Sequence, residues 1–147
     1  MKIFLMFSVL CLLSIGSAVG AADTVENPKS CQQCGMDRVA FAQSRMVVVY
    51  ADGTNFATCS LHCTVTEMRE HKGKQVKSLK VADYVTKELI DVRSATWVVG
   101  GKKPGVMTSL AKWAFARKED AQKFVGANGG RLTNFDEALE LALKEGE

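Results

Sequence analysis

Two cysteine pairs are the residues best suited to chemistry in this sequence. Cys31 and Cys34 form a C-x2-C pair, and Cys59 and Cys63 form a C-x3-C pair after 24 intervening residues. Two thiols separated by two residues can turn inward together on a tight loop, where they bind zinc, Cu(I) or an iron–sulfur cluster, or close a disulfide. Together the four cysteines have spacings specific enough for a four-thiolate zinc site.

The same spacings leave disulfides open as an alternative. If a helix begins at Cys59 or Ser60, Cys59 and Cys63 lie on one face of it, and the positive end of the helix dipole favours their thiolates. A disulfide within either pair would be strained or would distort the helix, whereas bridges between the pairs would fasten the N-terminal segment to the next unit. Thioredoxin-like exchange fits poorly, because that C-x-x-C motif normally lies near a β-α-β pattern.

Two methionines favour a soft metal over zinc. Met36 completes a Cys34-Gly35-Met36 motif, and a thioether is a poor zinc ligand but a good ligand for Cu(I). Met107 lies in a glycine-rich loop, where a methionine has less reason to fill a core than on a helix or strand. The alternative for both is ordinary packing. His62 is expected to be a solvent-facing helix residue rather than a ligand.

Composition and charge exclude several classes of function. The chain has 147 residues, of which 47% are hydrophobic and 24% charged, with a formal net charge of +3. That balance suits one compact domain or two very small ones and differs from that of a disordered chain. The charge is small and mixed, and no basic block with interleaved aromatic residues predicts nucleic-acid binding. No Ser-His-Asp set, phosphate-binding loop or pair of catalytic carboxylates stands out, so we do not expect an enzyme.

Residues 1–20 have the pattern of a secretory signal peptide. A positive start precedes the nearly all-apolar residues 3–15, and small residues then allow cleavage after Gly20 or Ala21. The apolar run is shorter than the roughly 20 residues that a membrane helix requires, so we expect no stable membrane span after processing. Cys11 lies inside the apolar run, where it is badly placed for a lipoprotein cleavage site, so no lipid anchor is expected. The processed protein is expected to be periplasmic, where disulfides can form.

The first half of the processed chain predicts a β-hairpin, a helix and a strand. Residues 21–44 are a lead-in that carries the C-x-x-C-G-M motif, and their polar start through residue 30 is expected to be flexible. Strong strand and turn signals follow: strands at 45–50 and 55–58 around an Asp52-Gly53 turn, a helix at 60–71 stopped by Gly73, and an extended stretch at 75–84.

The second half repeats this order. It predicts strands at 95–99 and 112–116, a helix at 119–125 closed by Asn128-Gly129-Gly130, a strand at 131–133, and a helix at 134–144 capped by Asn134 with Glu137 three residues later. The predicted class is α+β, with two consecutive β-β-α-β units at 45–93 and 94–147. Neither unit alone would bury much core, so we expect the two to pack together.

A resemblance to a known family rests on the order of motifs along residues 31–140. They are Cys34-Gly35-Met36, the Asp52-Gly53 hairpin, Asp83-Tyr84 with Ile90-Asp91, residues 95–100, Met107, residues 115–124 with Phe115, Ala116, Ala121 and Phe124, and Gly129-Gly130 with Phe135. Together they resemble the NosL family, the accessory copper proteins of nitrous oxide reductase. The family has two β-β-α-β units, in agreement with the repeat described above.

The resemblance implies an extracytoplasmic Cu(I) chaperone. It would deliver copper to a copper-accepting enzyme, nitrous oxide reductase in the first place, and could itself receive copper from other donors. The implied Cu(I) ligands are Cys34, Met36 and Met107, a set of one thiolate and two thioethers that holds Cu(I) firmly yet exchangeably.

Three features depart from the family pattern. Many members are lipoproteins, whereas no lipid anchor is expected here. The loop around Met107 reads Gly-Val-Met-Thr, whereas Gly-Pro-Met-Gly is frequent in the family. Cys59 and Cys63 stand where relatives usually have an aromatic or aspartate-containing turn. These two cysteines and Cys31 are further possible ligands. They keep two alternatives open, a small exported module with a four-cysteine structural zinc site and a thiol–disulfide or heavy-metal-handling protein.

Overall fold

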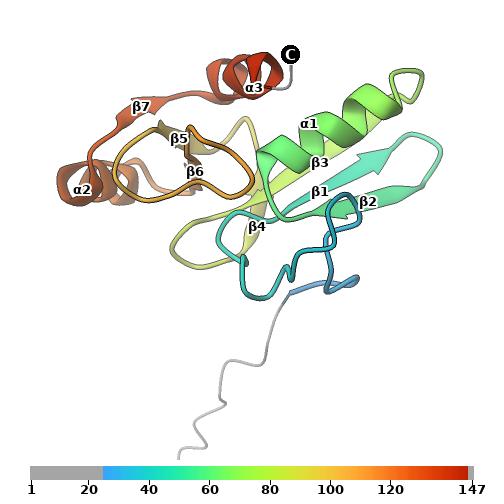
Figure 1. Cartoon of the computed structure of the whole chain (residues 1–147), viewed down its shortest axis with the longest axis horizontal. Coiled ribbons are helices and arrows are strands. Elements are labelled where there is room, and N and C mark those ends of the chain that lie inside the picture. The colour runs from blue at the N-terminus through green and yellow to red at the C-terminus, as the bar shows by residue number, and fades with distance from the viewer. Residues whose placement is uncertain (1–24, 146–147) are drawn as a thin grey trace, which may run out of the picture.

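The computed structural model describes residues 25–145. The predicted signal peptide, its cleavage sites and Cys11 lie outside the described residues. Between residues 25 and 145, no helix is both long and apolar enough to cross a bilayer. Two small antiparallel sheets and three helices make up this part of the chain (Figure 1).

The first unit is a four-stranded sheet with one helix. Its elements are β1 (Met46–Tyr50), β2 (Asn55–Thr58), α1 (Leu61–Glu70), β3 (Val76–Ala82) and β4 (Leu89–Asp91), with the strand order β2-β1-β3-β4. The predicted Asp52-Gly53 turn joins β1 to β2, with Gly53 at φ +86°. Asp52 Oδ1 accepts a hydrogen bond from Thr54 N at 2.8 Å. The strand β4 was not predicted; its three residues pair with the end of β3.

The second unit contains a three-stranded sheet. Its elements are β5 (Thr96–Val99), β6 (Lys112–Phe115), α2 (Lys118–Asn128), β7 (Arg131–Thr133) and α3 (Phe135–Lys144), with the strand order β6-β5-β7. Asn134 caps α3 as expected, because its Oδ1 accepts from Glu137 N at 3.0 Å. The α+β class and both β-β-α-β orders therefore agree with the prediction.

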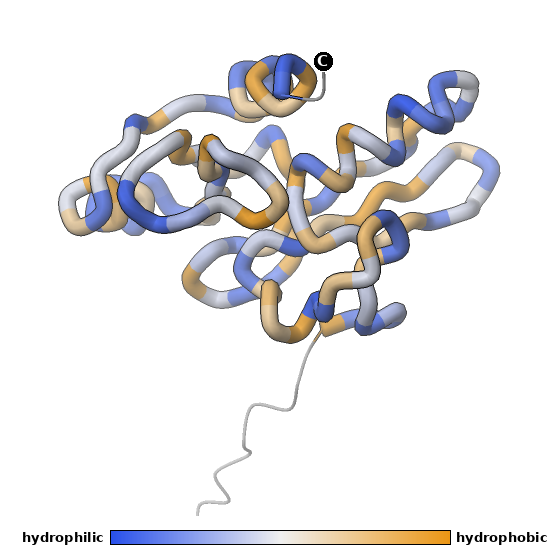
Figure 2. The backbone as a smooth tube through the Cα atoms, in the orientation of Figure 1, coloured by the Kyte–Doolittle hydropathy of each residue, from blue (hydrophilic) through white to orange (hydrophobic). Residues whose placement is uncertain are grey.

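The helix α3 brings the two units together. It lies beside α1 above the sheets (Figure 1), and the Arg69 guanidinium of α1 donates to Leu143 O near the end of α3. Below the helices, Phe135 of α3 packs on Trp97 of β5, with ring centroids 5.8 Å apart. In Figure 2 the strands under α1 are largely hydrophobic, whereas the far end of α1 and the turn after it are hydrophilic. The units thus share one core, as their small size requires.

A second cluster of buried residues contains three of the cysteines. Cys31, Cys59 and Cys63 pack there with residues of the second unit, among them Val98 and Trp113. The cluster therefore joins the N-terminal segment, the beginning of α1 and the sheet β6-β5-β7. Thiols placed in such a cluster are shielded from solvent on most sides.

The polar lead-in is fixed in place, and the prediction of a flexible segment is wrong for residues 25–30. Val25 is buried, and the fully buried Arg38 donates Nη1 to the carbonyl oxygens of Glu26 and Pro28 at 3.0 and 2.6 Å. The same guanidinium forms an ion pair with the Glu26 carboxylate, whose other oxygen accepts from Arg45 Nε at 3.1 Å. These charge-assisted hydrogen bonds stabilise one conformation of residues 25–30, which their polar sequence would not adopt by itself.

Replacing Gly130 with alanine is expected to lower the free energy of unfolding by about 2–3 kcal/mol. Gly130 has φ +89°, and a Cβ there would lie 2.8 Å from Val99 O and 2.9 Å from Gly100 O, both on the backbone. Urea denaturation of the variant measures the loss. Gly126→Ala is the matched control, because Gly126 lies inside α2 with open space around it, and this change is expected to stabilise by roughly 0.5–1 kcal/mol. Equal effects of the two changes would contradict this packing.

Candidate metal centre

The structure brings the four cysteines of the two predicted pairs to one point. The Sγ atoms of Cys31, Cys34, Cys59 and Cys63 all lie within 4.8 Å of one another. Cys34 Sγ is 3.5 Å from Cys59 Sγ, which is 3.7 Å from Cys63 Sγ. All four are free thiols, so the disulfide alternative is not the arrangement seen. Four convergent sulfurs are a donor set for a soft or borderline metal ion.

The C-x-x-C loop is shaped by backbone hydrogen bonds and tied to the edge of β2. Gly35 N donates to Cys31 O at 2.8 Å, and Cys31 N donates to Met36 O at 2.7 Å, which closes the loop on itself. Gln32 N donates to Ala57 O at 2.9 Å, and Gln32 Oε1 accepts from Ala57 N at 2.7 Å. This pairing holds the loop beside the last residues of β2, where the second cysteine pair begins.

The second pair sits at the N-terminus of α1, as the sequence predicted. Ser60 is the N-cap, and its Oγ accepts from Cys63 N at 3.4 Å. Ser44 Oγ donates to Cys59 O at 2.8 Å and thereby fixes the residue before the cap. Both sulfurs lie at the positive end of the helix dipole, which stabilises a thiolate or a thiolate-bound metal.

The protonation of the metal-free thiols is strongly uneven. Burial alone would raise the pKa of Cys31, but hydrogen bonds from the backbone of Cys34 and Gln33, and from Cys59, outweigh it and lower that pKa. Burial raises the pKa of Cys34 to about 11, and the thiols of Cys31 and Cys59 add to this. The Cys63 sulfur beside it, followed by burial, raises the pKa of Cys59. Metal binding at this centre therefore displaces protons from the thiols.

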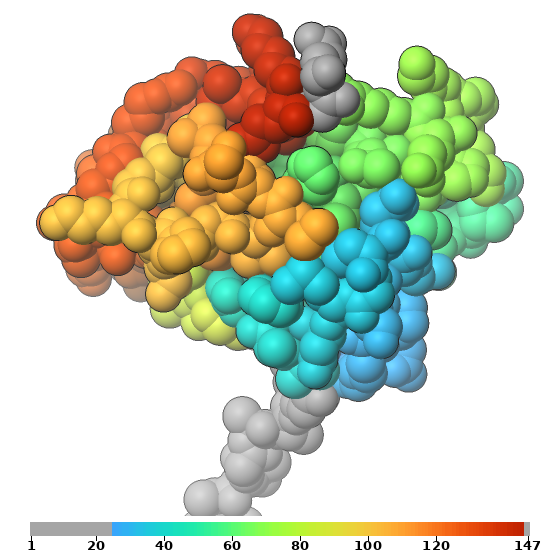
Figure 3. Space-filling model, viewed as in Figure 1, coloured from blue at the N-terminus to red at the C-terminus, as the bar shows by residue number. Residues whose placement is uncertain are grey.

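Access to the centre is one-sided. Cys31, Cys59 and Cys63 are each at most 2% exposed, whereas Cys34 reaches the surface. In Figure 3 the N-terminal segment carrying the C-x-x-C loop meets the beginning of α1 and the loop before β6 on one face. A metal held by the four sulfurs can thus be reached from outside through Cys34.

The two methionines lie at different depths. Met36 is half-buried against the cysteine-containing cluster. Met107 is 44% exposed and has φ +57°, which is unusual for a residue with a side chain. Its neighbour Val106 is buried in the same cluster as Cys31. The loop therefore joins the cysteine-containing cluster through Val106 and leaves Met107 exposed.

The Met107 loop is fastened to the end of α3. Glu145 accepts from Thr108 Oγ1 at 2.5 Å, from Leu110 N at 3.2 Å and from Lys112 Nζ at 2.9 Å. Lys112 is buried, so this ion pair is shielded from solvent. Burial would raise the pKa of Glu145, but the bonds to Lys112 and Thr108 outweigh it and lower that pKa. Sequence reasoning missed this support, because the partners are far apart along the chain.

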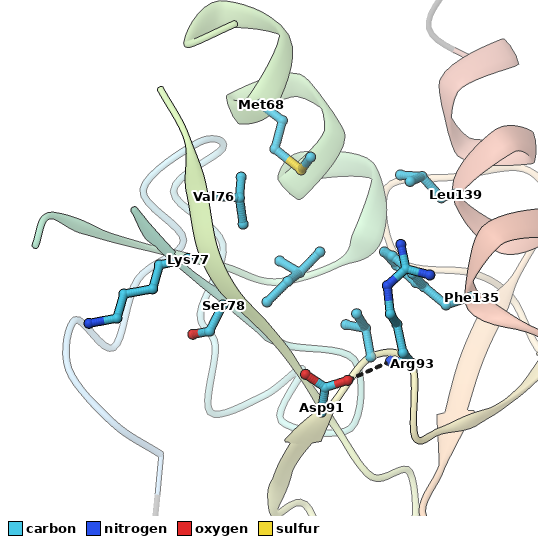
Figure 4. Close-up of a pocket in the computed structure, with 10 residues that line it drawn as sticks. Met68, Val76, Lys77, Ser78, Asp91, Arg93, Phe135 and Leu139 are labelled. Atoms are coloured by element: carbon cyan, nitrogen blue, oxygen red, sulfur yellow. Dashed lines mark hydrogen bonds between the residues drawn. The ribbon is translucent and has the colours of Figure 1, made fainter. Parts of the chain in front are cut away.

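A hollow beside the two helices has different chemistry. It lies between α1, β3, β4 and α3, and Figure 4 shows Met68 of α1 and Phe135 and Leu139 of α3 around it. Asp91 at its rim accepts from Arg93 N at 2.9 Å. Its lining is mainly apolar and contains a single sulfur, so it offers no ligand set comparable to the four cysteines. His62 likewise lies outside the metal-ligating groups found between residues 25 and 145.

Comparison with known proteins gives three findings. The family model of NosL matches residues 22–141. A 58-residue segment is 43% identical to the copper-binding lipoprotein NosL of Stutzerimonas stutzeri, and this segment covers 39% of the chain and 30% of that relative. The crystal structure of the copper chaperone NosL from Shewanella denitrificans is similar with a TM-score of 0.60 and 25% identity, covering 79% of this chain and 93% of that one.

Proposed function

The chain belongs to the NosL family, and on this premise we propose that it is an extracytoplasmic Cu(I) chaperone that delivers copper to a copper enzyme. The observation that carries the proposal is the group of four sulfurs within 4.8 Å, three of them buried and one accessible. An all-sulfur donor set favours Cu(I), and an accessible ligand is what a donor protein needs for exchange. The relatives are named as copper-binding proteins and not as enzymes, and a non-enzymatic role follows for this chain.

Cys34 is the residue on which the proposal depends most. It belongs both to the thiol group with Cys31, Cys59 and Cys63 and to the C-G-M motif with Met36. Cys34 and the three buried thiols would together hold the ion in the resting chaperone. The thioethers of Met36 and Met107 bind Cu(I) more weakly than thiolates and would take part when the ion leaves.

Delivery follows from ligand exchange at the accessible edge. An acceptor protein that offers sulfur or imidazole ligands can approach Cys34 and Met107 and replace the chaperone's ligands one at a time. The copper ion is then never released into solution during the transfer. A lipoprotein relative and the predicted signal peptide support a location outside the cytoplasm. Nitrous oxide reductase is the proposed acceptor, because the family resemblance that runs along the chain is to its accessory proteins.

The acceptor assignment predicts direct transfer. When the Cu(I)-loaded protein is mixed anaerobically with copper-free nitrous oxide reductase, copper is expected to move to the enzyme faster than it moves to a small chelator of equal affinity. Copper content of the two proteins after separation measures the transfer. If the enzyme gains copper no faster than the chelator does, nitrous oxide reductase is not the acceptor.

Structural zinc is the second candidate, because four thiols are the number of ligands that a tetrahedral structural zinc site requires. The two candidates predict different behaviour when the bound metal is displaced or removed. Under the copper proposal, one equivalent of Cu(I) displaces any zinc from the anaerobically purified protein, and the fold survives metal removal because Arg38 and the shared core hold it independently. Under the zinc alternative, chelation unfolds the region around the cysteines. Metal analysis with circular dichroism before and after chelation distinguishes them.

A further inference from the structure

A second group of metal-ligating side chains lies at the other end of α1. Glu67, Glu70 and His71 each present a ligand atom, and these atoms all lie within 4.8 Å of one another. The spacing i, i+3, i+4 places the three side chains on one face of the last helical turn. Cys59 and Cys63 lie at the opposite, N-terminal end of the same helix, and no residue is shared by the two groups.

Glu67 has an unusual environment for a carboxylate. Its side chain is 1% exposed. Oε1 accepts from Tyr50 OH at 3.0 Å and lies 2.9 Å from His71 Nδ1. Oε2 is buried and has no hydrogen-bond partner among the described residues. A buried carboxylate oxygen without a partner is costly, and a cation is one of the few groups that offsets this cost.

The Tyr50 side chain fixes the geometry around Oε1 and brings no positive charge. The Tyr50 hydroxyl donates to Oε1 and therefore leaves Oε2 without a donor. Lys74 Nζ lies 5.1 Å from the centroid of the Tyr50 ring, but it pairs with Asp52 at 3.2 Å. Lys74 is therefore already engaged by another carboxylate.

The outer side of the group is open to solvent. The His71 side chain is 42% exposed, and Glu70 is exposed. Gln33 Nε2 donates to Glu70 Oε1 at 3.2 Å, which leaves the second oxygen of that carboxylate available. A cation can thus approach from water toward His71 and Glu70 and reach the buried carboxylate behind them.

We propose that Glu67, Glu70 and His71 form a second metal site that binds a borderline divalent cation of the Zn²⁺ or Cu²⁺ class. One imidazole and two carboxylates suit these ions, whereas Cu(I) prefers the sulfurs at the other end of the helix. The protein then has two metal sites at the two ends of α1, one with sulfur ligands for a soft ion and one with carboxylate and imidazole ligands for a borderline ion. This site is independent of the Cu(I) function and exists whichever metal the thiols hold.

The test is a Zn²⁺ titration of the protein after its thiols have been saturated anaerobically with Cu(I). Calorimetry and ¹⁵N NMR of the histidine rings are expected to detect one further equivalent of Zn²⁺, with the shift confined to His71. His71→Ala and Glu70→Gln, both at exposed positions, are expected to weaken this binding by about tenfold or more. Glu67→Gln, which keeps the shape of the buried side chain, is expected to do the same.

His62→Ala is the matched control, because His62 is the other histidine of the chain and lies outside the group. It is expected to leave the Zn²⁺ affinity unchanged. A Cu(I)-loaded protein that binds no further Zn²⁺, or binds it equally tightly in the His71→Ala and Glu70→Gln variants, overturns the second site. Neither result bears on Cu(I) binding at the thiols, which is measured before Zn²⁺ is added.

Discussion

Cys34→Ser is expected to weaken Cu(I) binding by roughly 100-fold or more. Replacing even a residue that only hydrogen-bonds to a metal ligand typically lowers metal affinity about 10–100-fold, and Cys34 is proposed as a ligand itself. The change removes the one accessible sulfur of the four-cysteine group and replaces it with a hard hydroxyl. Because Cys34 reaches the surface, the free energy of unfolding is expected to stay close to that of the wild type. Anaerobic competition with a chromophoric Cu(I) chelator measures the affinity.

Gln33→Ser serves as the control for Cys34→Ser. It alters the adjacent position of the same loop, where the side chain bonds to the exposed Glu70 and to no thiol between residues 25 and 145, and it is expected to leave Cu(I) affinity unchanged. Met36→Leu and Met107→Leu are expected to cause smaller losses than Cys34→Ser, because thioethers are the weaker ligands. Cu(I) binding by Cys34→Ser as tight as that of the wild type would remove Cys34 from the site.

Arg38→Met is expected to lower the free energy of unfolding by about 3–5 kcal/mol. The guanidinium is fully buried, and its Nε donates to Thr58 O at 3.0 Å while its other nitrogens hold the Glu26 and Pro28 segment. Methionine fills much of the volume but leaves several buried carbonyl oxygens without a donor. Chemical denaturation of the metal-free protein measures the loss.

The position of Arg38 also predicts an effect on the metal centre. Thr58, whose carbonyl it holds, immediately precedes Cys59, so Arg38→Met is expected to weaken Cu(I) binding as well. Arg93→Met is the matched control, because the Arg93–Asp136 ion pair is 67% and 69% exposed and is worth less than about 1 kcal/mol. Similar stabilities of the two variants would show that the buried arginine does not hold the segment.

The elements with strong local signals could be predicted from the sequence. The Asp52-Gly53 turn and the alternating strands around it fixed the first hairpin, and the Asn134 cap fixed the start of α3. The strand β4 was missed because three residues carry too short a pattern to recognise. The lead-in was misjudged for a different reason. Its order comes from Arg38 and Arg45, whose bonds to it no local pattern announces.

The candidate site was predicted in its parts, and its assembly into one four-cysteine group only as one of several alternatives. Spacing identified each cysteine pair, and the helix prediction placed Cys59 and Cys63 at an N-terminus. Their convergence with Cys31 and Cys34 depends on the pairing of Gln32 with Ala57, which no periodicity in the sequence encodes. The ligand role of Met36 and Met107 stays a prediction, and the four thiols now form the larger part of the proposed site.

X-ray absorption at the copper K-edge of the protein loaded with one equivalent of Cu(I) tests the central proposal most directly. We expect a Cu(I) edge and a first coordination shell made of sulfur alone, supplied by Cys34 and the thiols around it. A shell that contains nitrogen or oxygen, unchanged in the Cys34→Ser variant, would contradict it and place the copper elsewhere in the protein.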